Sequence, residues 1–162
     1  MPKRLAKFGL TVAPDKTRLL RFSRFHPGLR RRFAFLDFEL YWAKDRKGSL
    51  RVMKRTGRKK LQQAKRRMKQ WTKANRHLPG RQFIKALNRK LVGRYNYFGI
   101  PSNGDSVGSF YHHAIGCAFK WLNRRGGKKS SFTWAAFKVA LKQLGVAAPR
   151  VVGGKKQHGV FV

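Results

Sequence analysis

The sequence predicts an α+β protein in which a small N-terminal β-hairpin or sheet is followed by a basic bundle of three to four helices. Two patterns support this class: apolar residues alternate across residues 33–42, and from Gly57 onward they recur at spacings of three and four. In addition, 41% of the 162 residues are hydrophobic and 13% are aromatic. Such a composition indicates a packed core rather than a disordered basic segment.

Residues 1–55 are predicted to hold the β-structure. Arg4 to Gly9 fits the end of a helix that closes at the glycine, and Thr17 to Phe22 alternates weakly, as a strand does. The clearest element is a hairpin with one strand over residues 33–42, a turn over 44–49 and a return strand over 50–55. The expected inner face of the long strand consists of Ala34, Leu36, Phe38, Leu40 and Trp42.

Residues 56–145 contain four amphipathic helical segments. The first ends at Leu78–Gly80, the third begins near Asp105 or Ser106 as its cap, and the fourth runs from a Thr133 cap to Gly145. The residues expected to face inward are Leu61, Ala64, Met68, Trp71 and Ala74; Phe83, Leu87, Leu91 and Tyr95; Phe110, Ala114, Ala118 and Leu122; and Trp134, Phe137, Ala140, Leu141 and Leu144. Residues 146–162 are predicted to form a loose, basic, glycine-containing tail.

The charge of the chain predicts a polyanionic partner. Lys and Arg number 40 against 5 acids, which gives a net charge of +35. No acid lies between Asp45 and Asp105, so the first two helices lack the i,i+4 partners that solvated charged helices normally carry. We therefore expect nucleic-acid phosphates to be bound by Arg58, Lys59, Lys65, Arg66, Lys69, Lys73, Arg76, Lys85, Arg89, Lys90, Arg94, Arg124 and Arg125.

Aromatic residues accompany these cations between Tyr95 and Phe98. Such rings either stack on the bases or sugars of a nucleic acid or pack in the protein core, and we expect about half of them to be core. Tyr97 is the candidate for contact with the nucleic acid.

The sequence offers no convincing catalytic or metal site. Asp37 and Glu39 share a predicted strand face, but without a third ligand we expect them to pair with surrounding arginines. Cys117 is the only cysteine and is expected to pack in a helix, and no glycine-rich phosphate loop is present. No transmembrane segment or signal peptide is recognisable, so we expect a cytoplasmic protein with no membrane partner.

Several short motifs resemble one family. Leu5–Leu10 followed by Pro14–Leu19 resembles the motif after the catalytic strand of group II intron reverse transcriptases. Phe35–Phe38 with the turn at Lys44–Gly48 is similar to the hairpin where palm meets thumb in that family. Arg94–Pro101 resembles its maturase-specific stretch, and the ending is similar at Lys120–Arg125 and Thr133–Trp134. These collinear matches extend from residue 5 to about residue 145.

The resemblance implies that residues 1–55 are the remnant of a palm end and that residues 56–145 are the α-helical thumb, or maturase X domain. It also implies that the paired aspartates of the polymerase, which lie upstream of the matching residues, are not part of this sequence. Lys16, which matches a lysine near the incoming nucleotide, is then vestigial, and Asp37 stands where the family usually has glycine. We expect no cofactor, with Mg²⁺ present only through bound RNA or a completed polymerase site.

The resemblance and the charge together leave three functions open. The first is an RNA-binding maturase domain, without polymerase activity, that binds structured group II intron RNA and assists its folding or splicing. The second is a fragment of a split reverse transcriptase whose fingers and palm come from another chain. The third is a structural ribonucleoprotein component, for example one associated with the ribosome.

Overall fold

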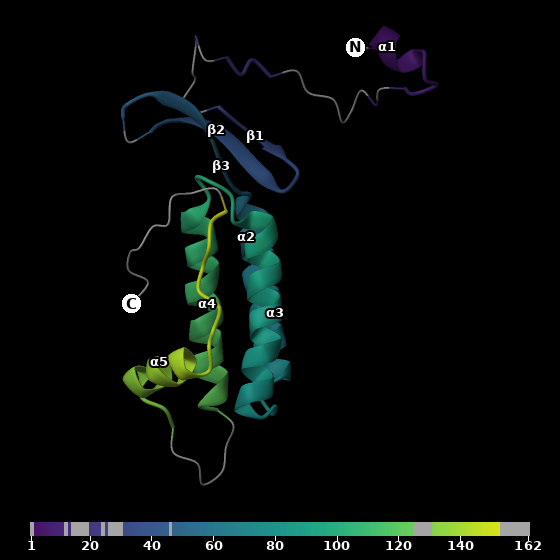
Figure 1. The fold of residues 1–162 in the computed structure, drawn as a ribbon. Helices are drawn as coiled ribbons and strands as arrows, with labels where there is room; N and C mark the ends of the chain where they lie inside the picture. The colour runs from purple at the N-terminus through teal and green to yellow at the C-terminus, as the bar shows by residue number, and fades with distance from the viewer. Residues whose placement is uncertain are drawn as a thin grey trace.

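A computed structural model shows a small sheet at one end of a helical bundle (Figure 1) and confirms the predicted α+β class. It describes residues 2–11, 13, 20–23, 25, 31–45, 47–124 and 131–152. The elements, in chain order, are α1 (Pro2–Ala6), β1 (Arg32–Phe35), β2 (Phe38–Lys44), β3 (Leu50–Thr56), α2 (Arg58–Ala74), α3 (Gly80–Phe98), α4 (Gly104–Leu122) and α5 (Trp134–Gln143).

The sheet is antiparallel with the order β1-β2-β3, and its first turn corrects the prediction of one strand over residues 33–42. Phe35 pairs with Phe38, so Leu36 and Asp37 form a two-residue hairpin turn between β1 and β2. Their φ angles of 45° and 69° are those of a type I′ turn. Apolar alternation hides this turn because Leu36, an exposed apolar residue, occupies a position where Asn or Gly is usual.

The other predictions for the N-terminal region have mixed outcomes. Helix α1 ends at Ala6 and the chain then turns at Gly9, whose φ is +66°, as expected. The return strand is confirmed as β3, in register with β2 from Phe38↔Thr56 to Lys44↔Leu50. Leu20 to Phe22 forms no strand, and the remainder of that predicted strand lies outside the described residues.

The helices bury the predicted faces around a central α4. Helix α4 packs against both α2 and α3, and α5 lies across the end of the bundle that is far from the sheet (Figure 1). The core consists of Met68, Phe83, Ile84, Leu87, Leu91, Tyr95, Val107, Phe110, Ala114, Ile115, Ala118, Phe137 and Leu141. The buried apolar faces are shorter than predicted, because Ala74, Trp134 and Leu144 at the helix ends are exposed.

Two of the predicted helix caps differ in outcome. The Thr133 hydroxyl accepts a hydrogen bond from the Ala136 N–H at 3.3 Å, which confirms it as the cap of α5. Helix α4 instead begins at Gly104, directly after Asn103 and before either predicted capping residue. The Asn103 side chain does not cap α4, because it binds the sheet, as described below.

The chain after α5 corrects the prediction of a loose tail from Val146 onward. Residues 146–152 run back along the bundle toward the sheet (Figure 1). The Asn88 carboxamide donates to the Gly145 carbonyl at 2.8 Å and accepts from the Ala147 N–H at 2.9 Å. Val146 and Ala147 also pack against the core, so burial and hydrogen bonds together hold this segment. Residues 153–162 lie outside the described residues.

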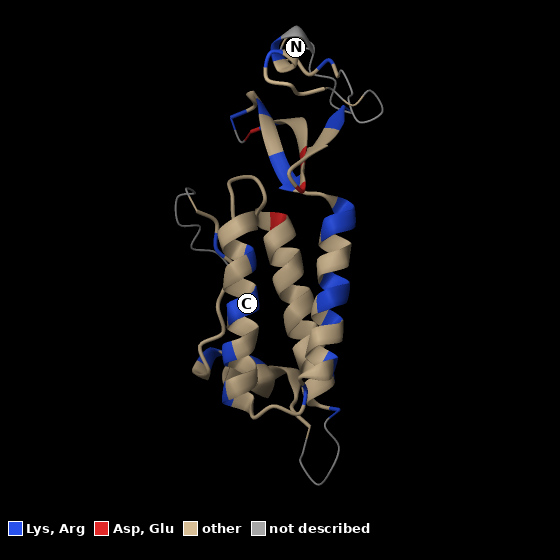
Figure 2. Cartoon of the chain, turned by 90° about the vertical axis from the view of Figure 1, so that its right-hand side faces the viewer, with Lys and Arg blue, Asp and Glu red and all other residues tan. Residues whose placement is uncertain are grey.

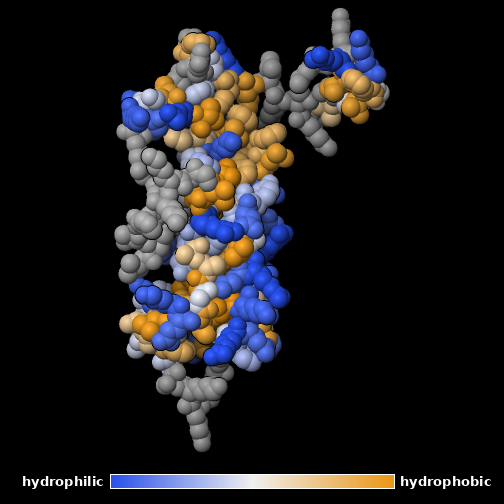
Figure 3. Space-filling model, in the orientation of Figure 1, coloured by the Kyte–Doolittle hydropathy of each residue, from blue (hydrophilic) through white to orange (hydrophobic). Residues whose placement is uncertain are grey.

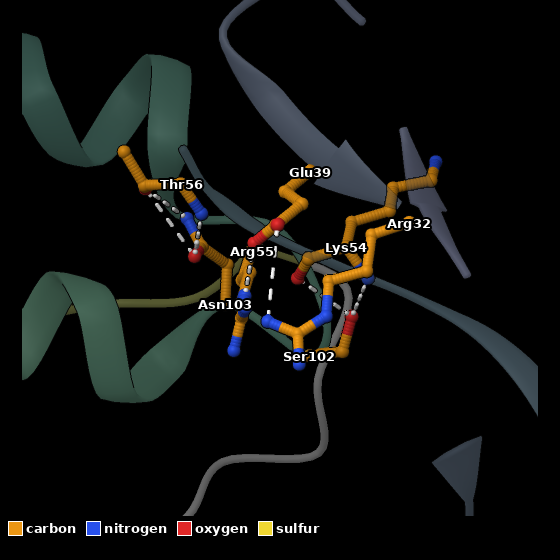
Figure 4. A network of polar contacts seen from close by, with 7 residues as sticks. All are labelled: Arg32, Glu39, Lys54, Arg55, Thr56, Ser102 and Asn103. Carbon is orange, nitrogen blue, oxygen red and sulfur yellow. Dashed lines mark hydrogen bonds and ion pairs between the residues drawn. The ribbon is translucent and has the colours of Figure 1, made fainter. Parts of the chain in front are cut away.

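The sheet is joined to the bundle through the loop before α4 (Figure 4). The fully buried Asn103 accepts from the Thr56 N–H at 2.7 Å, and its nitrogen donates to the Thr56 hydroxyl at 2.9 Å and to the Phe98 carbonyl at 2.8 Å. Next to it, the Ser102 hydroxyl accepts from the Lys54 N–H at 2.9 Å and donates to the Lys54 carbonyl at 3.1 Å. The side chains of Ser102 and Asn103 thus form the hydrogen bonds with the end of β3 that a neighbouring strand would otherwise form.

Candidate nucleic-acid interface

The predicted cations gather on α2 and α3, and Figure 2 shows α4 between these two helices. In or just after α2, Lys65 is half-buried, whereas Arg58, Lys59, Arg66, Lys69, Lys73 and Arg76 are exposed. In α3, Arg94 is half-buried, whereas Lys85, Arg89 and Lys90 are exposed. Helix α4 has one lysine, Lys120, so the visible cationic surface comes from the outer helices. Figure 3 shows the same hydrophilic band along one side of the bundle.

The described carboxylates leave most of this surface unneutralised. Asp37 pairs with Lys60 at 2.9 Å, Asp45 with Arg51 at 2.7 Å, and Glu39 with Arg55 at 2.6 Å. This confirms the expected arginine partner for Glu39, whereas Asp37 pairs with a lysine and belongs to the turn rather than to a strand shared with Glu39. Among the described residues, Lys60 is the one cation of α2 and α3 with a carboxylate partner.

A pocket of about 350 Å³ opens between α2 and α3, beneath the β1–β2 turn. Its lining combines cations, apolar side chains and one acid: Asp37, Lys60, Gln63, Ala64, Arg67, Met68, Trp71, Lys90, Arg94, Phe98 and Phe110. Two of its cations, Lys60 and Arg67, were missing from the predicted site. Their spacing of seven residues places them on one face of α2, which is the signal that could have identified them.

Arg94 is the most enclosed cation in this pocket. Its guanidinium carbon lies 4.3 Å from the ring centroids of both Phe98 and Phe110, and the ring quadrupoles favour a cation at this distance. Its Nε and Nη2 atoms are buried without a hydrogen-bond partner. Burial lowers the pKa of Arg94 to about 10, so the side chain remains charged at neutral pH.

A second group of cations surrounds Trp121 near the end of α4. Lys73, Arg76 and Arg124 lie 5.6, 5.7 and 5.7 Å from the centroid of its indole ring. The structure thereby brings the exposed Arg124 next to the end of α2, which its distance in sequence does not reveal. Arg125 lies outside the described residues.

The two tyrosines of the aromatic motif have different surroundings. Tyr95 is fully buried, and its hydroxyl donates to the Ala147 carbonyl at 3.2 Å. Tyr97 is 51% exposed, but its ring stacks on Phe38 with centroids 5.9 Å apart, and its hydroxyl donates to the Leu36 carbonyl at 3.3 Å. Tyr97 therefore supports the sheet while one part of the ring remains accessible.

His113 and Cys117 contact each other inside the bundle. The His113 Nε2 donates to the Lys65 carbonyl at 3.0 Å, and the buried Cys117 thiol lies 3.5 Å from the same nitrogen. Burial lowers the pKa of His113 and raises that of Cys117. Within the described ranges no three His, Cys, Asp or Glu residues are grouped as a metal site. Lys16 falls outside those ranges.

One comparison with known protein families concerns the helical bundle. Residues 61–139 match the group II intron, maturase-specific domain. This part of the chain is similar to that family. The match runs from α2 into α5, so it covers most of the helical bundle, and the sheet lies outside it. No curated protein and no solved structure matches the chain. None of the described helices is long and apolar enough to cross a membrane.

Proposed function

We propose that this chain is an RNA-binding maturase protein that holds structured group II intron RNA on α2 and α3 and assists its folding or splicing. The observation that carries the proposal is the cationic surface of these two helices, in which Lys60 alone has a described carboxylate partner. The maturase-specific domain match supports intron RNA as the ligand. In this proposal the bundle acts as the thumb, and the sheet is the end of a palm.

The physical basis is electrostatic attraction followed by counterion release. RNA phosphates condense cations, and a protein that replaces those cations gains free energy from their release. Helix α2 has 17 residues and therefore extends about 25 Å, long enough to face several successive phosphates. Phosphate contacts orient the protein on the RNA, while the rings near the same surface provide contacts to bases or sugars.

This function needs no polymerase site in the chain. Asp37, Glu39 and Asp45 already form ion pairs with basic residues, so they are poorly suited to hold two catalytic metal ions. We expect Mg²⁺ to act only through the bound RNA. A reducing compartment such as the cytoplasm suits a protein whose only cysteine, Cys117, is a buried free thiol.

One observation favours a second candidate, the fragment of a split reverse transcriptase. Exposed apolar side chains gather on the sheet end of the molecule (Figure 3), among them Phe35, Leu36, Leu50 and Val52. A second chain that supplies fingers and palm would cover such side chains. In a split reverse transcriptase, the purified partner and this chain together extend a primer. An RNA-binding maturase protein needs no such partner to bind the intron RNA.

Paired charge reversals test the RNA interface. Arg66→Glu/Arg67→Glu on α2 and Arg89→Glu/Lys90→Glu on α3 each shift the net charge by four units, and Lys138→Glu/Lys142→Glu on α5 is the matched control. We expect the α2 and α3 variants to lose at least tenfold more affinity for a group II intron RNA than the α5 variant. Equal losses in folded proteins would leave only nonspecific polycation binding.

Crosslinking in cells, followed by sequencing of the bound RNA, identifies the ligand. Recovery of ribosomal RNA instead of intron RNA would indicate a structural ribonucleoprotein component.

A further inference from the structure

The pocket between α2 and α3 has a charge that the described residues do not neutralise. Four cations line it, namely Lys60, Arg67, Lys90 and Arg94, and the one acid that lines it is Asp37. The Asp37 carboxylate already pairs with Lys60 at 2.9 Å. Three of the four cations therefore have no described carboxylate partner.

Arg94 shows most clearly that a ligand is expected here. Its charged group is packed against the rings of Phe98 and Phe110, where water is largely displaced. Two of its nitrogens are buried and donate to no acceptor, which is uncommon for buried polar atoms in native proteins and unfavourable for a charged group. An anion in the pocket, after a small shift of the guanidinium, provides the missing acceptor.

The shape and chemistry of the pocket favour a phosphate. A planar guanidinium donates two parallel hydrogen bonds to phosphate oxygens, and the neighbouring ammonium of Lys90 adds a point charge. Lys90 itself lies 5.2 Å from the ring centroid of Trp71, a second pocket residue, so its position is partly fixed. A pocket of about 350 Å³ also leaves room for the sugar beside the phosphate.

We propose that this pocket binds one backbone phosphate of the RNA, with Arg94 as its principal ligand and Arg67 and Lys90 at its sides. The inference rests on the proposed RNA-binding function, because the pocket lies between the two helices that carry the cationic surface. General electrostatic attraction involves many exposed cations, whereas this proposal assigns one phosphate to an enclosed cation, Arg94. Inorganic phosphate would offer the same chemistry, so the experiment separates the two sources.

The first comparison uses exposed residues, which can be replaced without disturbing the core. Arg67→Gln/Lys90→Gln removes two charges that line the pocket, and Arg66→Gln/Arg89→Gln removes two charges from the adjacent positions of the same helices. We expect the pocket pair to lower the affinity for group II intron RNA about tenfold more than the adjacent pair. Equal losses would overturn the pocket while leaving the cationic surface intact.

The second comparison addresses Arg94 itself. Charge-assisted hydrogen bonds of this kind are typically strong enough that we expect Arg94→Gln to lose about tenfold to hundredfold in RNA affinity. It should also reduce the slope of log affinity against log salt by about one. Arg94→Lys keeps the charge but loses the planar fork, so it should recover only part of the affinity. Melting temperatures of all variants identify any that fail to fold. If Arg94→Gln does not fold, the comparison of Arg67→Gln/Lys90→Gln with Arg66→Gln/Arg89→Gln decides whether the pocket binds RNA.

A titration with inorganic phosphate distinguishes a backbone phosphate of RNA from free phosphate as the ligand. Binding is followed by the fluorescence of the pocket residue Trp71, in a variant whose other three tryptophans are replaced by Phe. If RNA binds and displaces phosphate from this pocket, the proposal is supported. If phosphate binds but Arg94→Gln leaves RNA affinity and its salt slope unchanged, the RNA contact is refuted. If the unaltered chain binds no intron RNA at all, the proposed function fails independently of the pocket variants.

Discussion

The Asn103 carboxamide accepts a hydrogen bond from the backbone N–H of Thr56 and returns one to the Thr56 hydroxyl. Both residues are buried, and 47 positions separate them in the sequence. This contact joins the end of β3 to the start of α4, and a third bond, to the Phe98 carbonyl, adds the end of α3. One buried amide side chain therefore links the sheet to two helices of the bundle, beside the contacts that Ser102, Tyr97 and Lys60 make with the sheet and its first turn.

Removing that amide should lower stability substantially. We expect Asn103→Ala to reduce the free energy of unfolding by about 2–4 kcal/mol, because it leaves the buried Thr56 N–H without its side-chain acceptor and removes the bonds to the Thr56 hydroxyl and the Phe98 carbonyl. Urea unfolding followed by circular dichroism measures this loss. Asn75→Ala is the control, since that half-buried side chain makes one hydrogen bond, to the Trp71 carbonyl, and should cost about 1 kcal/mol or less. Similar losses for both variants would show that Asn103 has no special role.

The β1–β2 turn should be easy to stabilise. Leu36 has a φ of 45° and is 68% exposed, so its side chain bears the strain of the left-handed region with little compensating burial. We expect Leu36→Asn to raise the free energy of unfolding by about 1 kcal/mol, because Asn adopts this conformation readily. The control Phe35→Asn alters an exposed strand residue without positive φ and should be neutral or destabilising. A loss of stability in Leu36→Asn would contradict the type I′ assignment.

Acid should destabilise the α2–α4 contact through His113. Burial lowers the pKa of this imidazole below its usual 6.5, so the unfolded chain binds a proton more readily than the folded protein does. The stability that His113 contributes is therefore complete above about pH 6.5 and is lost as the pH falls below it, by at most about 1.4 kcal/mol per pH unit. The groups around the ring are the Lys65 carbonyl and ammonium, Lys69 and Cys117.

His113→Gln tests this expectation. The free energy of unfolding, measured by urea at intervals from pH 7.5 to pH 5, should fall less steeply in the variant than in the original chain. Parallel curves over this range would rule out His113 as the source of the dependence.

RNA affinity should depend steeply on salt. A footprint that neutralises about six phosphates loses roughly a thousandfold in affinity between 50 and 200 mM salt. Filter binding or fluorescence anisotropy over this range gives the slope directly. A nearly flat log–log plot would contradict binding through the exposed cations of α2 and α3.

The purified chain should not polymerise nucleotides. The Asp37, Glu39 and Asp45 carboxylates are held by Lys60, Arg55 and Arg51, and no described cluster of acids is available for two metal ions. Primer extension on an RNA template with Mg²⁺ and all four deoxynucleotides measures this. Extension by the chain alone, abolished by Lys16→Ala, would overturn the expectation.

The helical part of the fold was predictable because its signals are local. Apolar spacing of three and four identified the buried faces of α2, α3 and α4, and Thr133 and Gly145 marked the ends of α5. The absence of acids between Asp45 and Asp105 was by itself enough to indicate a cationic surface on the first two helices of the bundle. Each of these features depends on residues close together in the chain, where helix geometry alone relates sequence position to surface position.

Tertiary structure decided the features that depend on distant or ambiguous residues. Alternation could not reveal the break at Leu36 and Asp37, because neither residue is the glycine or asparagine that usually marks such a turn. The return of residues 146–152 along the bundle depends on hydrogen bonds to Asn88, more than fifty residues away. The pocket around Arg94 likewise requires α2 and α3 to be packed against α4, which contributes Phe110 to its lining. The amount of charge follows from composition, whereas the enclosure that distinguishes Arg94 from the exposed cations arises only when the helices pack.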